Sequence, residues 1–423
     1  MADDAQQREA QSAARATVDT VARRSYGKLV AFLAARTRDV AAAEDALSEA
    51  FASALSDWPA NGCPENPEGW LLTTARRKNI DAMRAANREE IATAQIRIIS
   101  EGLEAAAAES EIPDERLALL FACAHPAIDA SVRAPLMLQV VLGLDAVAIA
   151  SAFLVSPSTM GQRLVRAKNK IRLAEIPFRI PGRDELRERV DVVLDAIYAA
   201  FAQGWTDPAS TDAARRDLAF EAIFLCRLVT ELLPNEPEAL GLLALMLYAE
   251  SRSRARRSEQ GGYIPLEQQN LALWDCAQIE EAENLLFRAS KSGLVGRYQL
   301  EASLQSAHVE RRKTGRKNWE AVVELYEALY LLSRSPVVAI NRAVAIAELR
   351  GASEGLEALR EIENEPRLAQ YQPYWAARAD LLARNGQIAE SAGAYELAIG
   401  LERDAAVRQF LQGRLALLKV QKI

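Results

Sequence analysis

Apolar side chains recur at every third or fourth position over most of the chain, which is the spacing of amphipathic helices. One such stretch follows Asp39, whose carboxylate can accept hydrogen bonds from the free amides of a helix start. The pattern predicts an inward face made of Val40, Leu47, Ala50, Phe51, Ala54, Leu55 and Trp58. The outer face carries Glu44, Asp45, Ser48 and Glu49. An acidic ridge of this kind suits a basic partner helix, but the pattern alone favours simple exposure to water.

A second helix is predicted to begin at Trp70, because the prolines and glycines of residues 58–69 favour turns. Its inward positions are Leu72, Ala75, Ile80 and Met83. Its outer row is basic and consists of Arg76, Arg77, Lys78, Arg84 and Arg88. Phosphate contact is one interpretation of this row, and a solvated stripe of ion pairs around Asp81 is the other.

The most informative pattern runs from Asp145 to Arg172, where a short helix, a tight turn and a longer basic helix are expected. Ser156 is a suitable cap and Pro157 suits the first helical turn. The inward positions are Met160, Leu164, Ala167 and Ile171, and the opposite stripe holds Ser158, Thr159, Gln162, Arg163, Arg166 and Lys170. This pattern is typical of a recognition helix that reads the major groove of DNA. A solvated helix on a helical core is the alternative.

The region between the two basic helices is acidic and alanine-rich, and it predicts a mobile connector. Residues 176–182 interrupt the helical pattern and mark a domain junction. Beyond it the sequence predicts successive helical pairs. The clearest units are 318–351 and 372–401, whose period is close to the roughly 34 residues of tetratricopeptide repeats. Stacked pairs of this kind form a curved surface that suits a protein or ligand partner.

An insertion interrupts the helical pairs. Its candidate regulatory residues are Arg256, Arg257, Gly261, Gly262, Gln269, Trp274 and Asp275. The glycine pair lacks the lysine and hydroxyl of a phosphate-binding loop. We interpret the segment as an ordered loop at a domain contact, held by arginine bonds to carboxylates or carbonyls, with a ligand site as the alternative.

Composition supports an all-α protein, since alanine, leucine, glutamate and arginine are abundant and aromatic residues make up 6%. The net charge of −7 does not exclude DNA binding, because local basic stripes govern phosphate contact. Four scattered cysteines indicate neither disulfides nor a zinc site, and Cys123 with His125 is expected to pack rather than bind metal. We expect a cytoplasmic protein without a leader, a membrane span, a metal or another cofactor. With His125 and His308 as the only histidines, we do not expect an enzyme.

Residues 16–172 resemble bacterial RNA polymerase sigma factors of the extracytoplasmic-function type. The motifs that carry this resemblance are Ala43-Glu44-Asp45-Ala46 with Phe51, Trp70-Leu71 with Ala75-Arg76-Arg77, Asp81-Ala82-Met83-Arg84, and residues 159–168. The rest resembles the subgroup with a long tetratricopeptide-like extension, through Cys123-Ala124-His125-Pro126, Gln269 and Trp274-Asp275.

The resemblance implies a role for each predicted surface. Glu44, Asp45, Ser48 and Glu49 would dock on the clamp helices of the largest subunit of core RNA polymerase. Asn61 and its loop would receive a base flipped from the promoter element nearest the start site, beside Arg76, Arg77, Lys78, Arg84 and Arg88. The helix bearing Ser158, Thr159, Gln162, Arg163, Arg166 and Lys170 would read the more distant promoter element. The extension would take the place of a separate inhibitor.

The domains expected on this basis are a sigma region 2 domain over 1–100, an acidic linker over 101–112, a sigma region 4 domain over 113–175 and a regulatory extension over 176–423. Three positions depart from the family, because Ser48 stands where glutamine is frequent, and Asn270 and Leu271 replace an acid and an arginine of the extension. Two other readings remain open at this point. One is a helix-turn-helix regulator that is not a polymerase subunit, and the other is a repeat scaffold whose basic helices are merely solvated.

Overall fold

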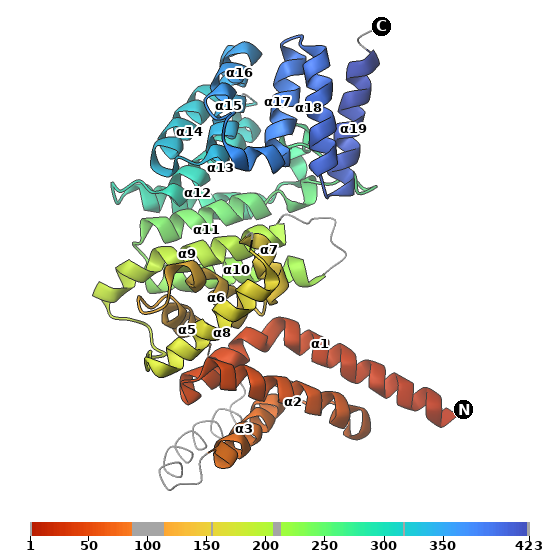
Figure 1. Ribbon diagram of the computed structural model, residues 1–423, viewed down its shortest axis with the longest axis vertical. Helices are drawn as coiled ribbons and strands as arrows, with labels where there is room; N and C mark the ends of the chain where they lie inside the picture. Colours follow the sequence, from red (N-terminus) through yellow and green to blue (C-terminus); the bar gives the residue numbers. More distant parts are fainter. Residues whose placement is uncertain (1, 87–113, 154, 206–212, 316–317, 421–423) are drawn as a thin grey trace. The chain divides into compact units, whose positions relative to one another are not determined.

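The computed structural model describes residues 2–86, 114–153, 155–205, 213–315 and 318–420, and Figure 1 shows their arrangement. Every regular element among them is helical, so the prediction of an all-α protein is confirmed. The chain forms two compact units. The first contains Met1–Thr206 with Asp212–Leu228, and the second contains Asp207–Thr211 with Val229–Ile423. The predicted acidic linker over 101–112 and the predicted contact Arg88 lie outside the described residues.

Three long helices open the first unit: α1 (Ala2–Thr37), α2 (Val40–Asn61) and α3 (Pro67–Ala86). Asp39 caps α2 as predicted, because its carboxylate accepts a hydrogen bond from the Ala42 amide at 3.1 Å. The inward face of α2 is confirmed at Val40, Leu47, Ala50, Ala54 and Trp58. The prediction for Leu55 is wrong, since 44% of this residue is exposed.

The loop between α2 and α3 is shorter than the prediction of turns over residues 58–69. Helix α2 continues through Pro59 because this proline lies in the last turn, where it removes few internal hydrogen bonds. Gly62 ends the helix with a positive φ of 87°, a conformation that glycine adopts without strain. The next helix begins at Pro67, not at Trp70, because proline suits the first turn and Asn66 accepts a hydrogen bond from the Gly69 amide at 2.9 Å.

Six further helices follow: α5 (Arg116–Cys123), α6 (Ala130–Val140), α7 (Ala146–Ala152), α8 (Pro157–Leu173), α9 (Arg183–Trp205) and α10 (Ala213–Leu232), whose last residues belong to the second unit. Helices α7 and α8 lie where the sequence predicts a short helix followed by a longer basic helix. Ser156 caps α8 by accepting a hydrogen bond from the Thr159 amide at 3.2 Å. The predicted inward residues Met160, Leu164, Ala167 and Ile171 are all buried.

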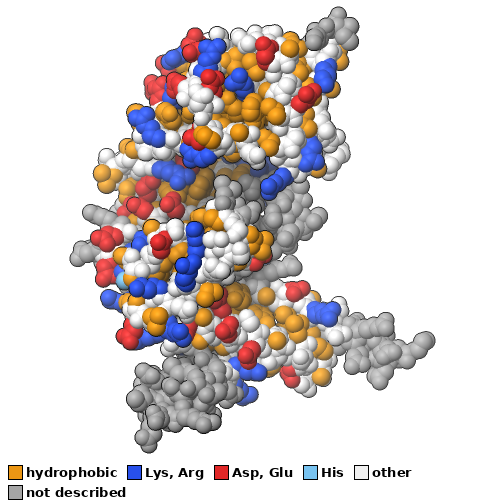
Figure 2. All heavy atoms as spheres, in the orientation of Figure 1, with side chains coloured by type: hydrophobic (Ala, Val, Ile, Leu, Met, Phe, Trp, Pro, Cys, Tyr) orange, Lys and Arg blue, Asp and Glu red, His pale blue; other side chains and the backbone are white. Residues whose placement is uncertain are grey.

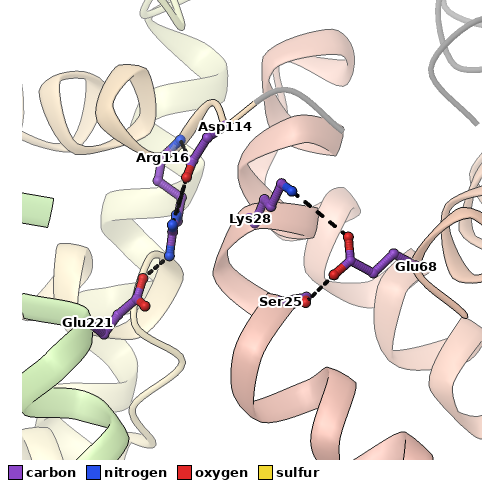
Figure 3. A network of polar contacts seen from close by, with 6 residues as sticks. All are labelled: Ser25, Lys28, Glu68, Asp114, Arg116 and Glu221. Carbon is purple, nitrogen blue, oxygen red and sulfur yellow. Dashed lines mark hydrogen bonds and ion pairs between the residues drawn. The ribbon is translucent and has the colours of Figure 1, made fainter. Parts of the chain in front are cut away.

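A buried arginine joins the start of α5 to α10 (Figure 3). Arg116 is 7% exposed and donates to the carboxylate of Asp114, with an Nη2–Oδ2 distance of 2.6 Å. It also pairs with Glu221 and lies over the ring of Phe224, 4.9 Å from the ring centroid. In this way α10 is fixed to the first unit by charge as well as by packing.

The second unit consists of helices that pack against their neighbours in the sequence (Figure 1). They are α11 (Pro237–Glu250), α12 (Cys276–Ser290), α13 (Arg297–Thr314), α14 (Trp319–Ser333), α15 (Pro336–Arg350), α16 (Ala352–Arg360), α17 (Gln372–Arg384), α18 (Ile388–Leu401) and α19 (Ala405–Val420). Four short 3-10 turns lie between them: η1 (Ser253–Ala255), η2 (Leu266–Gln268), η3 (Leu271–Leu273) and η4 (Pro366–Gln370). Helices α11 and α15 begin at Pro237 and Pro336, and proline suits the first turn of a helix.

Candidate nucleic-acid interface

The outward side of α8 carries the cations that the sequence places on the recognition helix. Arg166 and Lys170 are exposed and Arg163 is half-buried. These three residues line a groove of about 510 Å³ together with Ala127, Ile128, Asp129, Ser131, Val132 and Ala167. Thr159 and Gln162 lie nearer the amino end of the same helix, where Ser158 and Gln162 are exposed. Cations beside a groove, with polar side chains at the helix start, form an arrangement suited to phosphates and base edges.

A second hollow lies where the loop after α2 meets α3. Its volume is about 380 Å³, and it is lined by Pro64, Asn66, Gly69, Trp70, Thr73, Thr74 and Arg77. Trp70 is half-buried, and its ring meets that of Trp58 edge to face at a centroid distance of 5.5 Å. An aromatic wall with amide and hydroxyl groups can hold a planar group by stacking and hydrogen bonds.

The sequence prediction missed three of the polar residues in this hollow. Asn66, Thr73 and Thr74 line it, and the helical spacing from Trp70 to Arg77 was the signal that could have found the two threonines. The predicted contact Asn61 is exposed but is not among the lining residues. Its side-chain amide instead donates to Asp57 at 2.7 Å.

The structure describes the side chains of only part of the basic row of α3. Arg77 and Lys78 are exposed, and Arg76 is half-buried. The Lys78 ammonium lies 3.5 Å from the carboxylate of Glu49 on α2. The side chain of Arg84 lies outside the described residues. Thus the basic row and the acidic ridge, which were predicted separately, meet at the Lys78–Glu49 pair.

The acidic ridge of α2 differs from the prediction at one residue. Asp45, Ser48 and Glu49 are exposed as expected, but the side chain of Glu44 is only 13% exposed. Its carboxylate accepts a hydrogen bond from the ammonium group of Lys168 on α8 at 2.5 Å. Burial raises the pKa of the Glu44 carboxyl, and Lys168 opposes this rise. Lys168 was not among the predicted site residues, because nothing in the local pattern marks a contact 124 positions away.

Two segments of the chain match known protein families, and most of the chain is similar to one bacterial protein. Residues 21–89, which include the whole of α2 and α3, match the family described as Sigma-70 region 2. Residues 189–290 match a family of unknown function, DUF6596. Uncharacterized protein R00370 of Rhizobium meliloti (strain 1021) is 35% identical over 383 residues, which cover 89% of this chain and 90% of that protein. This chain belongs to the family of that rhizobial protein. No solved structure matches it.

The Sigma-70 region 2 match supports a sigma factor that acts in transcription initiation. Within region 2 lie the acidic ridge, the polar hollow and the basic residues Arg76, Arg77 and Lys78. On the face drawn in Figure 2, basic and acidic side chains are interspersed over the coloured residues, so phosphate contact depends on local groups of cations.

The DUF6596 region contains the insertion that the sequence marks as regulatory. Arg257 pairs with Asp404 at the start of α19, and its backbone forms an isolated antiparallel bridge with Tyr263. The turn between them contains Gly261, with a positive φ of 81°, and Gly262, whose amide donates to the Ser258 hydroxyl at 3.0 Å. The segment is therefore ordered, and these contacts lie within the second unit.

The remaining predicted residues of the insertion are buried or form hydrogen bonds. Gln269 and Trp274 are buried, and Asp275 caps α12 by accepting hydrogen bonds from Ala277 and Gln278. Burial lowers the pKa of Arg256 to about 10. A small cavity of about 110 Å³ beside Trp274 is lined by Leu266, Glu267, Ala307, His308, Asn318, Trp319 and Val322. The ligand-site alternative thus has a physical location.

Among the described residues, no group of three or more His, Cys, Asp or Glu side chains is placed to hold a metal ion. Cys123 is buried, and the Nδ1 atom of His125 accepts a hydrogen bond from the Ala127 amide at 3.1 Å. None of the described helices has the length and apolar character required to cross a bilayer.

Proposed function

We propose that this protein is a promoter-specificity subunit of RNA polymerase, a sigma factor of the extracytoplasmic-function type whose carboxy-terminal helical extension controls it. The observation that carries the proposal is the Sigma-70 region 2 match over α2 and α3, in the same compact unit as helix α8 with its outward cations. A polymerase subunit of this kind needs one surface for the enzyme and two for the promoter. The first unit has a candidate for each.

The enzyme contact is assigned to the acidic ridge of α2. Asp45, Ser48 and Glu49 face solvent, where a basic coiled coil such as the clamp helices could reach them. Opposite charges on two docking surfaces speed association and fix orientation. Glu44 belongs to the same ridge and would join the contact once its pairing with Lys168 is broken.

The promoter element nearest the start site is assigned to the hollow beside Trp70. A base flipped out of the duplex can stack on the exposed part of this indole, and Asn66, Thr73 and Thr74 offer hydrogen bonds to its edge. Arg77 lines the hollow and Lys78 follows it in the sequence, and both have the charge to hold the neighbouring phosphates. We assign Arg76, Arg84, Arg88 and Asn61 to the same promoter contact on the sequence pattern.

The more distant promoter element is assigned to α8. Arg163, Arg166 and Lys170 would neutralise phosphates, and Ser158, Thr159 and Gln162 would reach base edges near the helix start. The second unit, with its tetratricopeptide-like helical pairs, would bind a protein or small ligand that regulates this activity. The chain itself makes and breaks no bond, and its place of work is the cytoplasm.

Reconstitution with core RNA polymerase tests the proposal. We expect the protein to form a stable complex with core enzyme and to open a subset of promoters from its host, which permanganate footprinting would detect. Replacing Arg166 with glutamine should weaken promoter binding by about 1–3 kcal/mol and lower the salt dependence by about one counterion. Glutamine at Lys291, an exposed lysine of the second unit, serves as the matched control and should leave promoter binding unchanged.

The same experiment separates the proposal from a DNA-binding regulator that is not a polymerase subunit. Such a regulator would bind duplex DNA tightly by itself in a gel shift and would not associate with core enzyme. No complex with core polymerase and no opening at any promoter would contradict the proposed function.

A further inference from the structure

Helix α8 contacts α2 through a side that the DNA-binding prediction does not use. Lys168 extends from this side and donates to the carboxylate of Glu44 at 2.5 Å. Each side chain is 13% exposed, so the pair is largely shielded from water. One turn further along α8, the guanidinium of Arg172 lies 3.8 Å from the carboxylate of Asp39, which caps α2. Two cations of one helix therefore meet two carboxylates at the amino-terminal half of the other.

The surroundings of Glu44 place this contact at a junction of several helices. Its negative charge acts on the phenol of Tyr26 in α1 and on the thiol of Cys123 in α5. Burial raises the pKa of both groups, and the nearby carboxylate adds to the rise. Glu44 thus lies among α1, α2, α5 and α8, and a partner protein can reach its carboxylate only after α8 moves.

A basic helix on the acidic ridge is the arrangement that the proposed function requires of core polymerase. In this structure a basic helix of the same chain already occupies part of that ridge. Lys168 supplies one ammonium group to Glu44, as a lysine or arginine of the enzyme would. The two partners have the same charge and claim the same carboxylate.

We propose that α8 is an internal competitor for the polymerase-docking surface of α2, held there by the Glu44–Lys168 pair. Core polymerase and α8 exclude one another at Glu44, so the free protein has a closed state in which this residue is withheld. Binding of the enzyme separates α8 from α2 and frees the recognition helix to reach the distant promoter element. This inference rests on the proposed function, because the competitor has meaning only if α2 binds the enzyme.

The chemistry of the pair suits a contact that must open. A lysine ammonium is a compact charge with a flexible stem, and it forms no bidentate fork with a carboxylate. The desolvation of two shielded charges offsets much of their attraction. The closed state is therefore favoured only modestly. If about nine molecules in ten are closed, releasing α8 raises the apparent affinity for a partner of α2 about tenfold.

A distance measurement without polymerase tests the closed state. Cysteines introduced at Ser56 of α2 and Asn169 of α8, both exposed, would carry spin labels in a chain whose exposed Cys63 and Cys276 are replaced by serine. We expect a narrow distance distribution in the parent chain and a broad, longer one after Lys168→Glu. The charge-swapped double variant, Glu44→Lys with Lys168→Glu, should restore the narrow distribution. A narrow distribution in the single variant, or no restoration in the double one, would overturn the assignment to this pair.

A binding measurement tests the competition. Full-length protein with Lys168→Gln should bind core polymerase about tenfold more tightly than the parent chain, in the absence of DNA. The control Lys291→Gln removes the same charge from an exposed site on the second unit and should not change the affinity. Equal, measurable affinities of the parent chain and Lys168→Gln would overturn the competition while leaving the proposed function intact. No binding by any variant would instead overturn the proposed function, and this inference with it.

Discussion

Two ion pairs of the first unit join helices that are far apart in the sequence, and they are built differently. Arg116 donates through Nε and Nη2 to Asp114, at 2.9 and 2.6 Å, pairs with Glu221 and stacks on the ring of Phe224. Lys168 donates a single hydrogen bond, to Glu44. An arginine fork loses less freedom per bond than a lysine and matches the geometry of a carboxylate. The first contact is suited to permanent fixation and the second to release.

The pKa values of the two carboxyl groups point in opposite directions. Burial alone would raise the pKa of Asp114, but the hydrogen bonds and charge of Arg116 bring it below its ordinary value of 3.8. At Glu44 burial prevails over Lys168, and the pKa lies above its ordinary value of 4.5. The Arg116 contact thus favours the ionised carboxylate on folding, whereas the Lys168 contact does not repay the desolvation of its partner.

The largest expected effect follows removal of the arginine. Arg116→Met should lower the free energy of unfolding by about 3–5 kcal/mol, because Asp114 and Glu221 would remain shielded without a cation. Urea denaturation measures the total change, and hydrogen exchange of peptides from α5 and α10 locates it in the first unit.

An exposed arginine pair provides the matched control. Arg367 pairs with Glu365 through a side chain that is 72% exposed, and Arg367→Met should leave the stability almost unchanged because water screens the pair. If Arg116→Met and Arg367→Met lost similar amounts of stability, the contribution of Arg116 to stability could not come from its shielding and its second carboxylate.

A smaller effect is expected at the second contact. Lys168→Met should cost about 1–2 kcal/mol, since Glu44 can take up a proton instead of remaining as an unpaired carboxylate. The exposed Lys78–Glu49 pair gives the control, because Lys78→Met should cost less than about 1 kcal/mol. A loss for Lys168→Met as large as that for Arg116→Met would abolish the distinction between a fixed and a releasable contact.

Local sequence patterns were sufficient for the helices and for the exposed cations. Spacing located α2 and α8 with their caps at Asp39 and Ser156, because capping and amphipathic periodicity act within a few residues. The start of α3 was missed by three residues, since the sequence alone does not say that a proline will begin a helix and not end a loop.

The ion pairs made by Lys168 and by Arg116 could not be predicted from the sequence. Lys168 and Glu44 are 124 positions apart, and Arg116 of α5 reaches Glu221 of α10 although α6, α7, α8 and α9 lie between them in the sequence. Periodicity assigned Glu44 to the outer face of its own helix, where it does lie, but α8 covers that face. Burial between elements depends on tertiary packing, which a single helix pattern does not contain.

The smallest expected effect concerns the pH dependence of stability, to which Asp114 and Glu44 contribute in opposite directions. The folded-state pKa of Asp114 is lowered, so its contribution to stability is present above about pH 3.8 and is lost as the pH falls below that value. The folded-state pKa of Glu44 is raised, so its contribution is greatest below about pH 4.5 and declines as the pH rises through the folded-state pKa. The groups that face Glu44 are Lys168, Asp45, Tyr26 and Cys123, and burial raises the pKa of the phenol and of the thiol, which therefore stay neutral throughout this range.

Isosteric amides isolate the two contributions. The stability of Glu44→Gln relative to the parent chain should rise as the pH rises from about 4.5 to 7, because the parent then ionises a carboxyl that folding desolvates and the amide does not. Asp114→Asn should lose stability over the same range, because the parent keeps an ionised carboxylate on Arg116 that the amide cannot replace. Urea unfolding at several pH values measures both differences. If the stabilities of the two amide variants, relative to the parent chain, changed in the same direction with pH, the two ion pairs would differ in packing alone. The strength with which Arg116 and Lys168 stabilise an ionised carboxylate would then not distinguish them.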